Sequence, residues 1–272
     1  MRNRFSPICF VCIWAPSFDV FRISVDGINV FVELAWAKIN YTASVFHRQG
    51  LRAKGMKAII FGAPGSGKGT YASRLQARLG VDVIAMGDIF REMMKENSDL
   101  GRKIKSYVEK GSLVPDDLVN KVLKERLEKV PAGRGVILDG YPRTIQQAEN
   151  LDNFVKIDVV ILLMVPDWII IERLSSRRIC SNCGTVYNIR FLKPKVEGIC
   201  DKCGGKLYQR PDDTPEVIKN RLQVYEAQTQ PLLQKFQEKK TPFVVAHCDK
   251  LDMPPETVVE AIIKDLQKLK LA

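Results

Sequence analysis

The sequence predicts an α/β fold: a central five-stranded parallel sheet flanked by helices, with a small cysteine-rich insertion. Three observations support this prediction. Apolar, β-rich runs alternate with helical patterns after Met56, a glycine-rich turn joins the first run to the first helix, and two Cys-x-x-Cys pairs interrupt the alternation. Strands that alternate with helices usually pair in parallel and carry helices on both faces.

Five short runs have the composition of buried strands: Lys57–Phe61, Val83–Ala85, Val136–Leu138, Asp158–Val165 and Phe243–Ala246. Helical spacing of apolar residues lies between them. It predicts a helix over Thr70–Leu79 that ends at Gly80, because glycine is the usual residue after a helix C-terminus. A second helix is predicted over Asp116–Lys129, and a third runs from about Pro255 through Leu269.

Composition favours anionic partners in a reducing compartment. The chain of 272 residues has 42 Lys and Arg against 31 Asp and Glu, a formal charge of +11. Such an excess suits nucleic acid, acidic membrane surfaces or phosphorylated small molecules. No apolar run is long enough to predict a transmembrane helix. Seven cysteines, an odd number with four in paired spacing, argue for a metal site rather than a secreted disulfide scaffold.

Residues 1–55 do not follow the pattern of the rest. They are rich in aromatic residues and show no sustained helical or strand period. Their acidic residues, Asp19, Asp26 and Glu33, are unlike a targeting presequence. Met56 begins the stretch MKAIIFGAPGSGKGT, which resembles the start of a domain. We expect residues 1–55 to be an extension that is poorly ordered or belongs to a mis-called start, and residues 56–272 to form the functional domain.

The stretch GAPGSGKGT, Gly62 to Thr70, predicts a phosphate-binding loop. Its glycines allow backbone N–H groups to surround a phosphate, and the following helix N-terminus adds partial positive charge. Lys68 is placed to reach the β- and γ-phosphates. Gly69 stands between Lys68 and Thr70, a variant that resembles the loop of nucleoside monophosphate kinases.

Cys180, Cys183, Cys200 and Cys203 form two pairs separated by the 16 residues GTVYNIRFLKPKVEGI. Two Cys-x-x-Cys pairs at this spacing predict a tetrahedral zinc site. Four sulfur ligands leave no position open to water, so the zinc should be structural. Two disulfides or four free thiols are the alternatives.

The phosphate loop, GDIFR (Gly87–Arg91), DGYPRT (Asp139–Thr144) and the cysteine insertion occur in the order found in adenylate kinases, and the chain resembles the long-lid, zinc-containing prokaryotic type from Met56 to Ala272. The resemblance implies a P-loop kinase that transfers the γ-phosphate of ATP to AMP with Mg²⁺, giving two ADP. It implies a cytoplasmic monomer whose partners are ATP, AMP and ADP, without nucleic acid or membrane. Residues 86–115 would close over AMP, and a lid of residues 177–214 would close over ATP.

The resemblance also implies roles for individual residues. The catalytic set is Lys68, Arg143, Arg177, Arg210 and Arg221. The ATP-binding set is Gly65, Ser66, Gly67, Lys68, Gly69, Thr70, Arg173, Arg177, Val186, Tyr187 and Met253. The AMP-binding set is Met86, Gly87, Arg91, Ser112, Leu113, Val114, Gly140, Tyr141, Pro142, Arg143, Gln147, Arg210 and Arg221. Asp139 would hold magnesium through water, Asp88 is a second candidate, and Asp212 and Asp213 would orient arginines.

Two other functions are kept open. The same fold could serve UMP, CMP or GMP as acceptor, because Met86 stands where many bacterial relatives have threonine. A zinc-ribbon module that binds nucleic acid is suggested by the positive charge and the cysteine pairs. The insertion has few basic residues, however, and its aromatic residues, Tyr187, Phe191 and Tyr208, lack an RNA-stacking pattern.

Overall fold

The protein is described from a computed structural model, which describes residues 20–25, 28–33, 53, 55–96 and 98–272. The chain divides into two compact units, Met1–Arg48 and Gln49–Ala272. In the first unit, β1 (Val20–Val25) and β2 (Ile28–Glu33) pair antiparallel, an element that the sequence did not predict. The expected lack of order was stated for residues 1–55; apart from β1, β2, Ala53 and Gly55 these lie outside the described residues, and the expectation stays a prediction.

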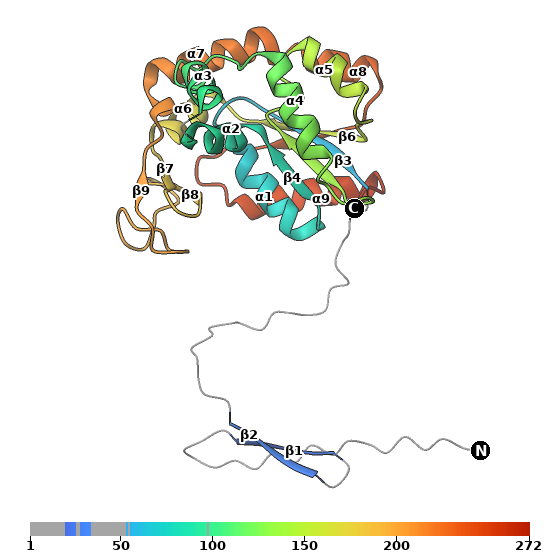
Figure 1. Cartoon of the computed structure of the whole chain (residues 1–272), viewed down its shortest axis with the longest axis vertical. Helices are drawn as coiled ribbons and strands as arrows, with labels where there is room; N and C mark the ends of the chain where they lie inside the picture. Colours follow the sequence, from blue (N-terminus) through green and yellow to red (C-terminus); the bar gives the residue numbers. More distant parts are fainter. Residues whose placement is uncertain (1–19, 26–27, 34–52, 54, 97) are drawn as a thin grey trace, which may run out of the picture. The chain divides into compact units, whose positions relative to one another are not determined.

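The second unit contains a five-stranded sheet in the order β10-β6-β3-β5-β4, with all neighbouring strands parallel (Figure 1). Its strands are β3 (Lys57–Phe61), β4 (Asp82–Ala85), β5 (Val136–Asp139), β6 (Val159–Met164) and β10 (Phe243–His247). Each coincides with a predicted run to within one residue at either end. The predicted fold class is confirmed.

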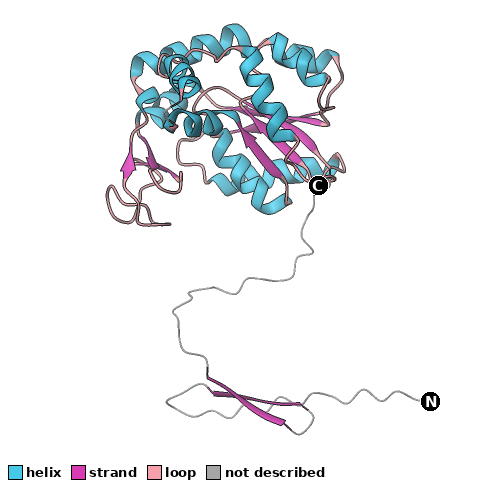
Figure 2. Ribbon diagram, in the orientation of Figure 1, coloured by secondary structure: helices cyan, strands magenta, loops and turns pink. Residues whose placement is uncertain are grey.

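Helices surround this sheet, as Figure 2 shows. They are α1 (Lys68–Leu79), α2 (Met86–Lys95), α3 (Asp99–Val108), α4 (Asp116–Leu127), α5 (Ile145–Asp152), α6 (Asp167–Ser175), α7 (Pro215–Val224), α8 (Leu232–Glu238) and α9 (Pro255–Lys268). A π-helical turn, η2 (Tyr225–Thr229), follows α7, and a 3₁₀ turn, η1 (Pro211–Asp213), precedes it. None of these helices is both long and apolar enough to cross a membrane.

Side chains that alternate along the strands build one core on each face of the sheet. In β3, Ala58 and Ile60 pack in the cluster that contains α1 and α9. Ile59 and Phe61 pack in the opposite cluster, with residues of α2, α4, α5 and α8. Because both faces are covered, the strands read as continuous apolar runs rather than as an apolar–polar alternation.

The cysteine-rich insertion forms a separate small sheet. β7 (Arg177–Cys180) lies between β8 (Val186–Asn188) and β9 (Leu207–Tyr208), and both pairings are antiparallel. Its buried cluster consists of Cys180, Tyr187 and Cys200, with Leu207 packed against them. So few apolar contacts suggest that another interaction stabilises this segment.

The larger unit begins slightly before the predicted boundary at Met56. Ala53 is buried in the core, and its N–H donates to the carbonyl of Leu79 at 3.3 Å. The backbone N–H of Gly55 donates to the carbonyl of Gly133 at 3.0 Å. These contacts make Ala53 and Gly55 part of the packed body.

Candidate active site

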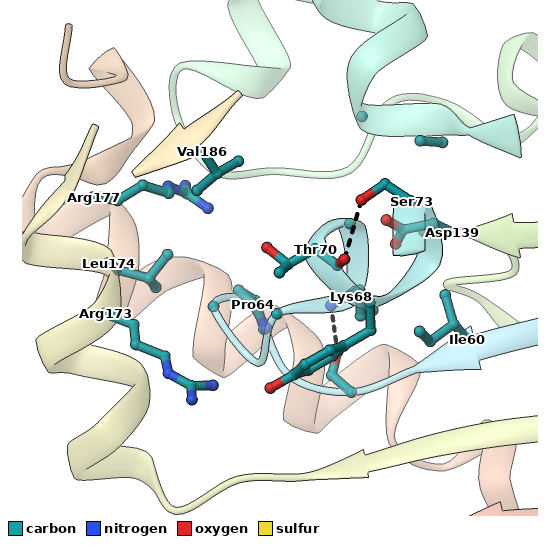
Figure 3. A pocket seen from close by; sticks show the side chains of 18 of the residues that line it. Ile60, Pro64, Lys68, Thr70, Ser73, Asp139, Arg173, Leu174, Arg177 and Val186 are labelled. Carbon is teal, nitrogen blue, oxygen red and sulfur yellow. Dashed lines mark hydrogen bonds between the residues drawn. The ribbon is translucent and has the colours of Figure 1, made fainter. Parts of the chain in front are cut away.

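A large cavity lies at the carboxyl ends of the parallel strands, the usual position of a site in such a sheet. Its volume is about 850 Å³, and the loop between β3 and α1 forms part of its wall. Figure 3 shows Asp139, at the end of β5, on one side of Lys68 and Thr70, and Arg173, Arg177 and Val186 on the other. The cavity is of a size that can enclose small ligands.

The glycine-rich loop needs glycine where it enters α1. Gly67 has φ +97°, a left-handed conformation, and a Cβ there would lie 2.8 Å from Cε2 of Tyr71. The loop therefore curls tightly over the helix N-terminus. Lys68 folds back across it, with its Nζ donating to the carbonyl oxygens of Gly62 at 2.6 Å and Ala63 at 3.0 Å. The predicted phosphate loop thus has the shape of an anion-binding site.

Lys68 and Asp139 both line the cavity, and the charge of each affects the pKa of the other. The pKa of Lys68 is lowered to about 8, chiefly by removal from water; the charge of Asp139 opposes this shift, and those of Arg143, Arg221 and Arg177 contribute to it. Removal from water likewise raises the pKa of Asp139, while Lys68 and Arg143 act in the opposite direction. A bound phosphate would relieve the repulsion among these cations.

Six predicted arginines reach the same cavity from different elements. Arg91 comes from α2 and Arg143 from the loop after β5; the others are Arg173, Arg177, Arg210 and Arg221. Burial, and next the charge of Arg91, lowers the pKa of Arg210 to about 10. Burial likewise lowers the pKa of Arg221 to about 10, although Asp212 opposes this. Among the described atoms, the buried Nε of Arg210 has no hydrogen-bond partner, as expected for a donor whose acceptor is a ligand.

Two neighbouring carboxylates hold the lid-side arginines. The Asp213 side chain is fully buried, and it accepts two hydrogen bonds from Arg177, one from Nε at 2.8 Å. Nη1 of Arg221 lies 3.6 Å from Asp213 and 2.9 Å from Asp212. Burial raises the pKa of Asp212, but Arg221 and Arg210 outweigh it and hold the pKa below its usual value. These contacts match the predicted orienting role.

The two predicted magnesium-binding carboxylates are not equivalent. Asp88 and Asp139 both line the cavity. Asp88 already pairs with Arg91, and Nη2 of Arg210 lies 3.8 Å away from it. Asp139 makes no such ion pair within the described part of the chain. Since Mg²⁺ is usually bound by one or two carboxylates together with phosphates and water, Asp139 fits this role better.

The cavity excludes five predicted nucleotide-binding residues, although it includes the others. Ser66, Met86, Ser112, Val114 and Gln147 are absent from its wall. Met86 is 1% exposed and Gln147 is 2% exposed, and both ends of the Gln147 amide bond other parts of the protein. Direct contacts of these five residues with nucleotide stay predictions.

Sequence reasoning missed several residues of the cavity wall. Tyr225 and Thr229 lie on the π-helical turn η2, and Leu174 lies under the phosphate loop, where a Cβ on Gly65 would be 2.7 Å from its Cγ. Nothing in the apolar spacing distinguishes a π-helical turn from the continuation of α7. The turn itself is informative, because such turns are frequent at functional sites.

The four insertion cysteines converge on a point suited to a metal. Their Sγ atoms all lie within 4.8 Å of one another. The Sγ atoms of Cys180 and Cys203 are 3.4 Å apart, and those of Cys183 and Cys200 are 3.6 Å apart. Zinc–sulfur bonds of about 2.3 Å in a tetrahedron require sulfurs about 3.8 Å apart, whereas a disulfide needs about 2.05 Å. The cluster therefore fits a tetrahedral metal site, and the disulfide alternative does not hold.

Comparison with known proteins agrees with this site. A family model described as adenylate kinase matches residues 60–241. The adenylate kinase of Caldicellulosiruptor bescii is 50% identical over 189 residues, covering 68% of this chain and 88% of the relative. That of Lachnospira eligens is 47% identical over 216 residues, covering 78% of this chain and 100% of the relative. The chain belongs to the adenylate kinase family.

Proposed function

We propose that the protein is an ATP:AMP phosphotransferase, which moves the γ-phosphate of ATP to AMP reversibly and gives two ADP. The observation that carries the proposal is the convergence of Lys68 and six arginines on one cavity beside the phosphate loop, in a chain of the adenylate kinase family. So many cations suit two phosphate-bearing ligands better than one. The described site thus favours a kinase over a nucleic-acid-binding module.

The reaction requires positioning and charge neutralisation. An oxygen of the AMP phosphate attacks the γ-phosphorus, the bond between that phosphorus and its bridging oxygen to the β-phosphate breaks, and ADP leaves with that oxygen. The attacking oxygen is already ionised, so no side chain needs to remove a proton. When Mg²⁺ is bound, it neutralises phosphate charge, and Asp139 would hold it through water.

The cationic residues divide this work by position. Lys68 and the loop N–H groups would hold the donor phosphates, and Arg91 and Arg143 the acceptor phosphate. Arg177, Arg210 and Arg221 would neutralise the charge that spreads over the transferred group, since arginine binds phosphate oxygens in a bidentate way and stays charged. Arg177 is held for this role by Asp213.

Both predicted mobile segments contribute to the cavity wall. Gly87, Asp88, Arg91 and Leu113 come from residues 86–115, and Arg177, Val186 and Tyr187 come from the lid. In the proposal these segments close over AMP and ATP and exclude water, which would otherwise accept the phosphate.

The four cysteines would hold a structural Zn²⁺ that stabilises the lid. The metal site is adjacent to the nucleotide cavity, because Tyr187 lines the cavity and its hydroxyl oxygen lies 3.4 Å from Sγ of Cys200. In the same proposal the enzyme is a monomer in the cytoplasm, a reducing compartment in which the described cysteines would stay free of disulfides.

Met86 was the reason to consider an acceptor other than AMP. Its side chain is 1% exposed and is not part of the cavity wall. Met86 therefore supplies no argument for UMP, CMP or GMP, and the proposal of AMP rests on the family match.

Nucleotide stoichiometry tests the proposed reaction. The full chain is incubated with ATP, AMP and Mg²⁺, and the nucleotides are separated by chromatography. Two ADP should form for each ATP consumed, and ATP should persist when AMP is omitted. Lys68→Ala should abolish the reaction, whereas Lys264→Ala, on the exposed side of α9, should not. Loss of ATP without loss of AMP would show hydrolysis and contradict the proposal.

A further inference from the structure

Arg143 is held by its main chain as well as by its side chain. Its guanidinium lines the cavity, and its Nε donates to the carbonyl of Gly140 at 2.9 Å. Its backbone N–H donates to Oε1 of Gln147 at 2.7 Å, and its carbonyl accepts from Oγ1 of Thr229 at 3.0 Å. The two ends of this residue are thus fixed by side chains from different elements.

The hydrogen bonds of Gln147 allow only one orientation of its amide. Oε1 faces the Arg143 N–H, which can only donate, and Nε2 donates to Oδ1 of Asp116 at 2.6 Å. An ionised carboxylate can only accept. Turning the amide over would place donor against donor at Arg143 and acceptor against acceptor at Asp116. The charge of Asp116 therefore fixes which end of Gln147 meets Arg143.

Asp116 also holds the start of α5. Its Oδ2 accepts from the hydroxyl of Thr144 at 2.8 Å, and the Thr144 oxygen in turn accepts from the Gln147 N–H at 3.1 Å as the helix cap. Asp116 is the first residue of α4 and directly follows the segment expected to close over AMP. Both of its oxygens thus serve the loop that carries Arg143.

Thr229 approaches from the opposite side. It is 7% exposed and ends the π-helical turn η2. The Arg143 carbonyl is partly buried, and without Thr229 it would lose this hydrogen bond, which is unfavourable. Thr229 is therefore well placed to fix the position of the Arg143 carbonyl group.

We propose that Asp116, acting through Gln147, and Thr229 are positioning residues that fix the main chain of Arg143 and so the place of its guanidinium. The expected effect on AMP binding rests on the proposed function, in which Arg143 binds the acceptor phosphate. Loss of either contact then weakens binding of AMP and leaves binding of ATP unchanged.

Kinetics of threonine variants test the Thr229 arm. Thr229→Val should raise the KM for AMP about tenfold, equivalent to about 1.4 kcal/mol, since the loss of one hydrogen bond to a partly buried carbonyl is of this size. The KM for ATP should stay within about twofold. Thr229→Ser should restore the wild-type KM. Thr257→Val, an exposed helical threonine on α9, is the matched control. Equal changes in both KM values, no change, or failure of serine to restore binding would overturn this arm.

Thermal melting of exchanged variants tests the Asp116 arm without any nucleotide, so its result does not depend on the proposed reaction. Asp116→Asn should lower the melting temperature, because it leaves one acceptor oxygen for the two donors Gln147 and Thr144. Gln147→Glu should lower it as well, because it places a second carboxylate against Asp116. Combining the two substitutions again gives each donor an acceptor. The new amide nitrogen at position 116 can donate to the new carboxylate at position 147, and that carboxylate can also accept from the N–H of Arg143. The new amide oxygen at position 116 can accept from Thr144.

The double variant should therefore melt above the less stable single variant. A double variant that melts at or below that temperature would overturn the proposal.

Discussion

Replacement of Asp213 by asparagine should destabilise the nucleotide-free protein strongly and the nucleotide-bound protein much less. The Asp213 side chain is fully buried between Arg177 and Arg221, both of which line the cavity. Asparagine keeps the shape but removes the negative charge. Arg177 then loses its ion-pair partner and Arg221 keeps only Asp212, so the mutual repulsion of the two guanidinium groups is less well offset.

The magnitude follows from the distances. Nη1 of Arg221 lies 3.6 Å from Oδ1 of Asp213, and Nε of Arg177 lies 2.8 Å from Oδ2. At an effective dielectric constant of about 20, the longer pair alone attracts by about 4 to 5 kcal/mol. Removing one partner of a buried ion pair reduces the free energy of unfolding by about 3 to 5 kcal/mol. For a domain of this size each kcal/mol lowers the melting temperature by about 2 to 4 °C, so the loss should be about 6 to 20 °C.

The dependence on nucleotide distinguishes this reasoning from general damage to the core. ADP phosphates bring negative charge to the same arginines, so saturating ADP should recover a large part of the loss. Calorimetry with and without ADP measures both quantities. Asp152→Asn, in an exposed pair with Lys239, should change stability by no more than about 1 kcal/mol. A loss for Asp213→Asn that is equally small, or that is unchanged by ADP, would refute the reasoning.

Three further predictions concern the loop, the lid and the acceptor side. Lys68 has a pKa of about 8 in the free protein rather than 10.5, so kcat/KM for ATP should fall as the pH rises through 8. The free energy of unfolding should rise between pH 8 and 10.5, because only the unfolded protein keeps the Lys68 proton in that range. A kcat/KM that stays level to pH 10, or a Lys68→Arg variant with the same decline, would contradict this. Cys200→Ser should lower the melting temperature clearly while changing turnover at 25 °C little. Lost turnover at an unchanged melting temperature would argue against a structural metal. Gly140→Ala should raise the KM for AMP at least fivefold, because a Cβ at this position would lie 2.7 Å from Arg143 Nη2. Gly140 also has φ +76°, and a left-handed backbone conformation alone costs alanine about 1 kcal/mol. An unchanged KM for AMP in steady-state kinetics would count against this prediction.

Local sequence patterns were sufficient to predict the sheet and the phosphate loop. Strand β3 matches its predicted bounds, Lys57–Phe61, because a strand covered on both faces must be apolar at every position. Helix α1 begins two residues before the predicted start, at Lys68, since its first turn is formed by the phosphate loop itself. The cysteine spacing likewise predicted a cluster whose sulfurs the fold brings within 4.8 Å.

Contacts between distant segments could not be predicted in this way. The hydrogen bond from Gln147 to Asp116 spans 31 positions of sequence, and the one from Thr229 to Arg143 spans 86. Each partner alone looks like an ordinary polar residue of a helix. The hairpin of β1 and β2 was missed for a different reason. Polar and apolar residues alternate only briefly in β1, VFRISV, and the apolar run inside β2, INVFVE, breaks the pattern that marks a strand with one covered face.

The most direct test of the central claim compares kcat/KM for AMP, GMP, CMP and UMP, with ATP and Mg²⁺, in a coupled assay of ADP formation. The account predicts that AMP is preferred over each of the others by at least about tenfold, a difference of about 1.4 kcal/mol in transition-state binding. It also predicts that Lys68→Ala abolishes the activity. Comparable rates with all four acceptors, or a preference for another monophosphate, would contradict the assignment as an AMP-specific kinase. Absence of ADP formation with every acceptor would contradict phosphotransfer itself.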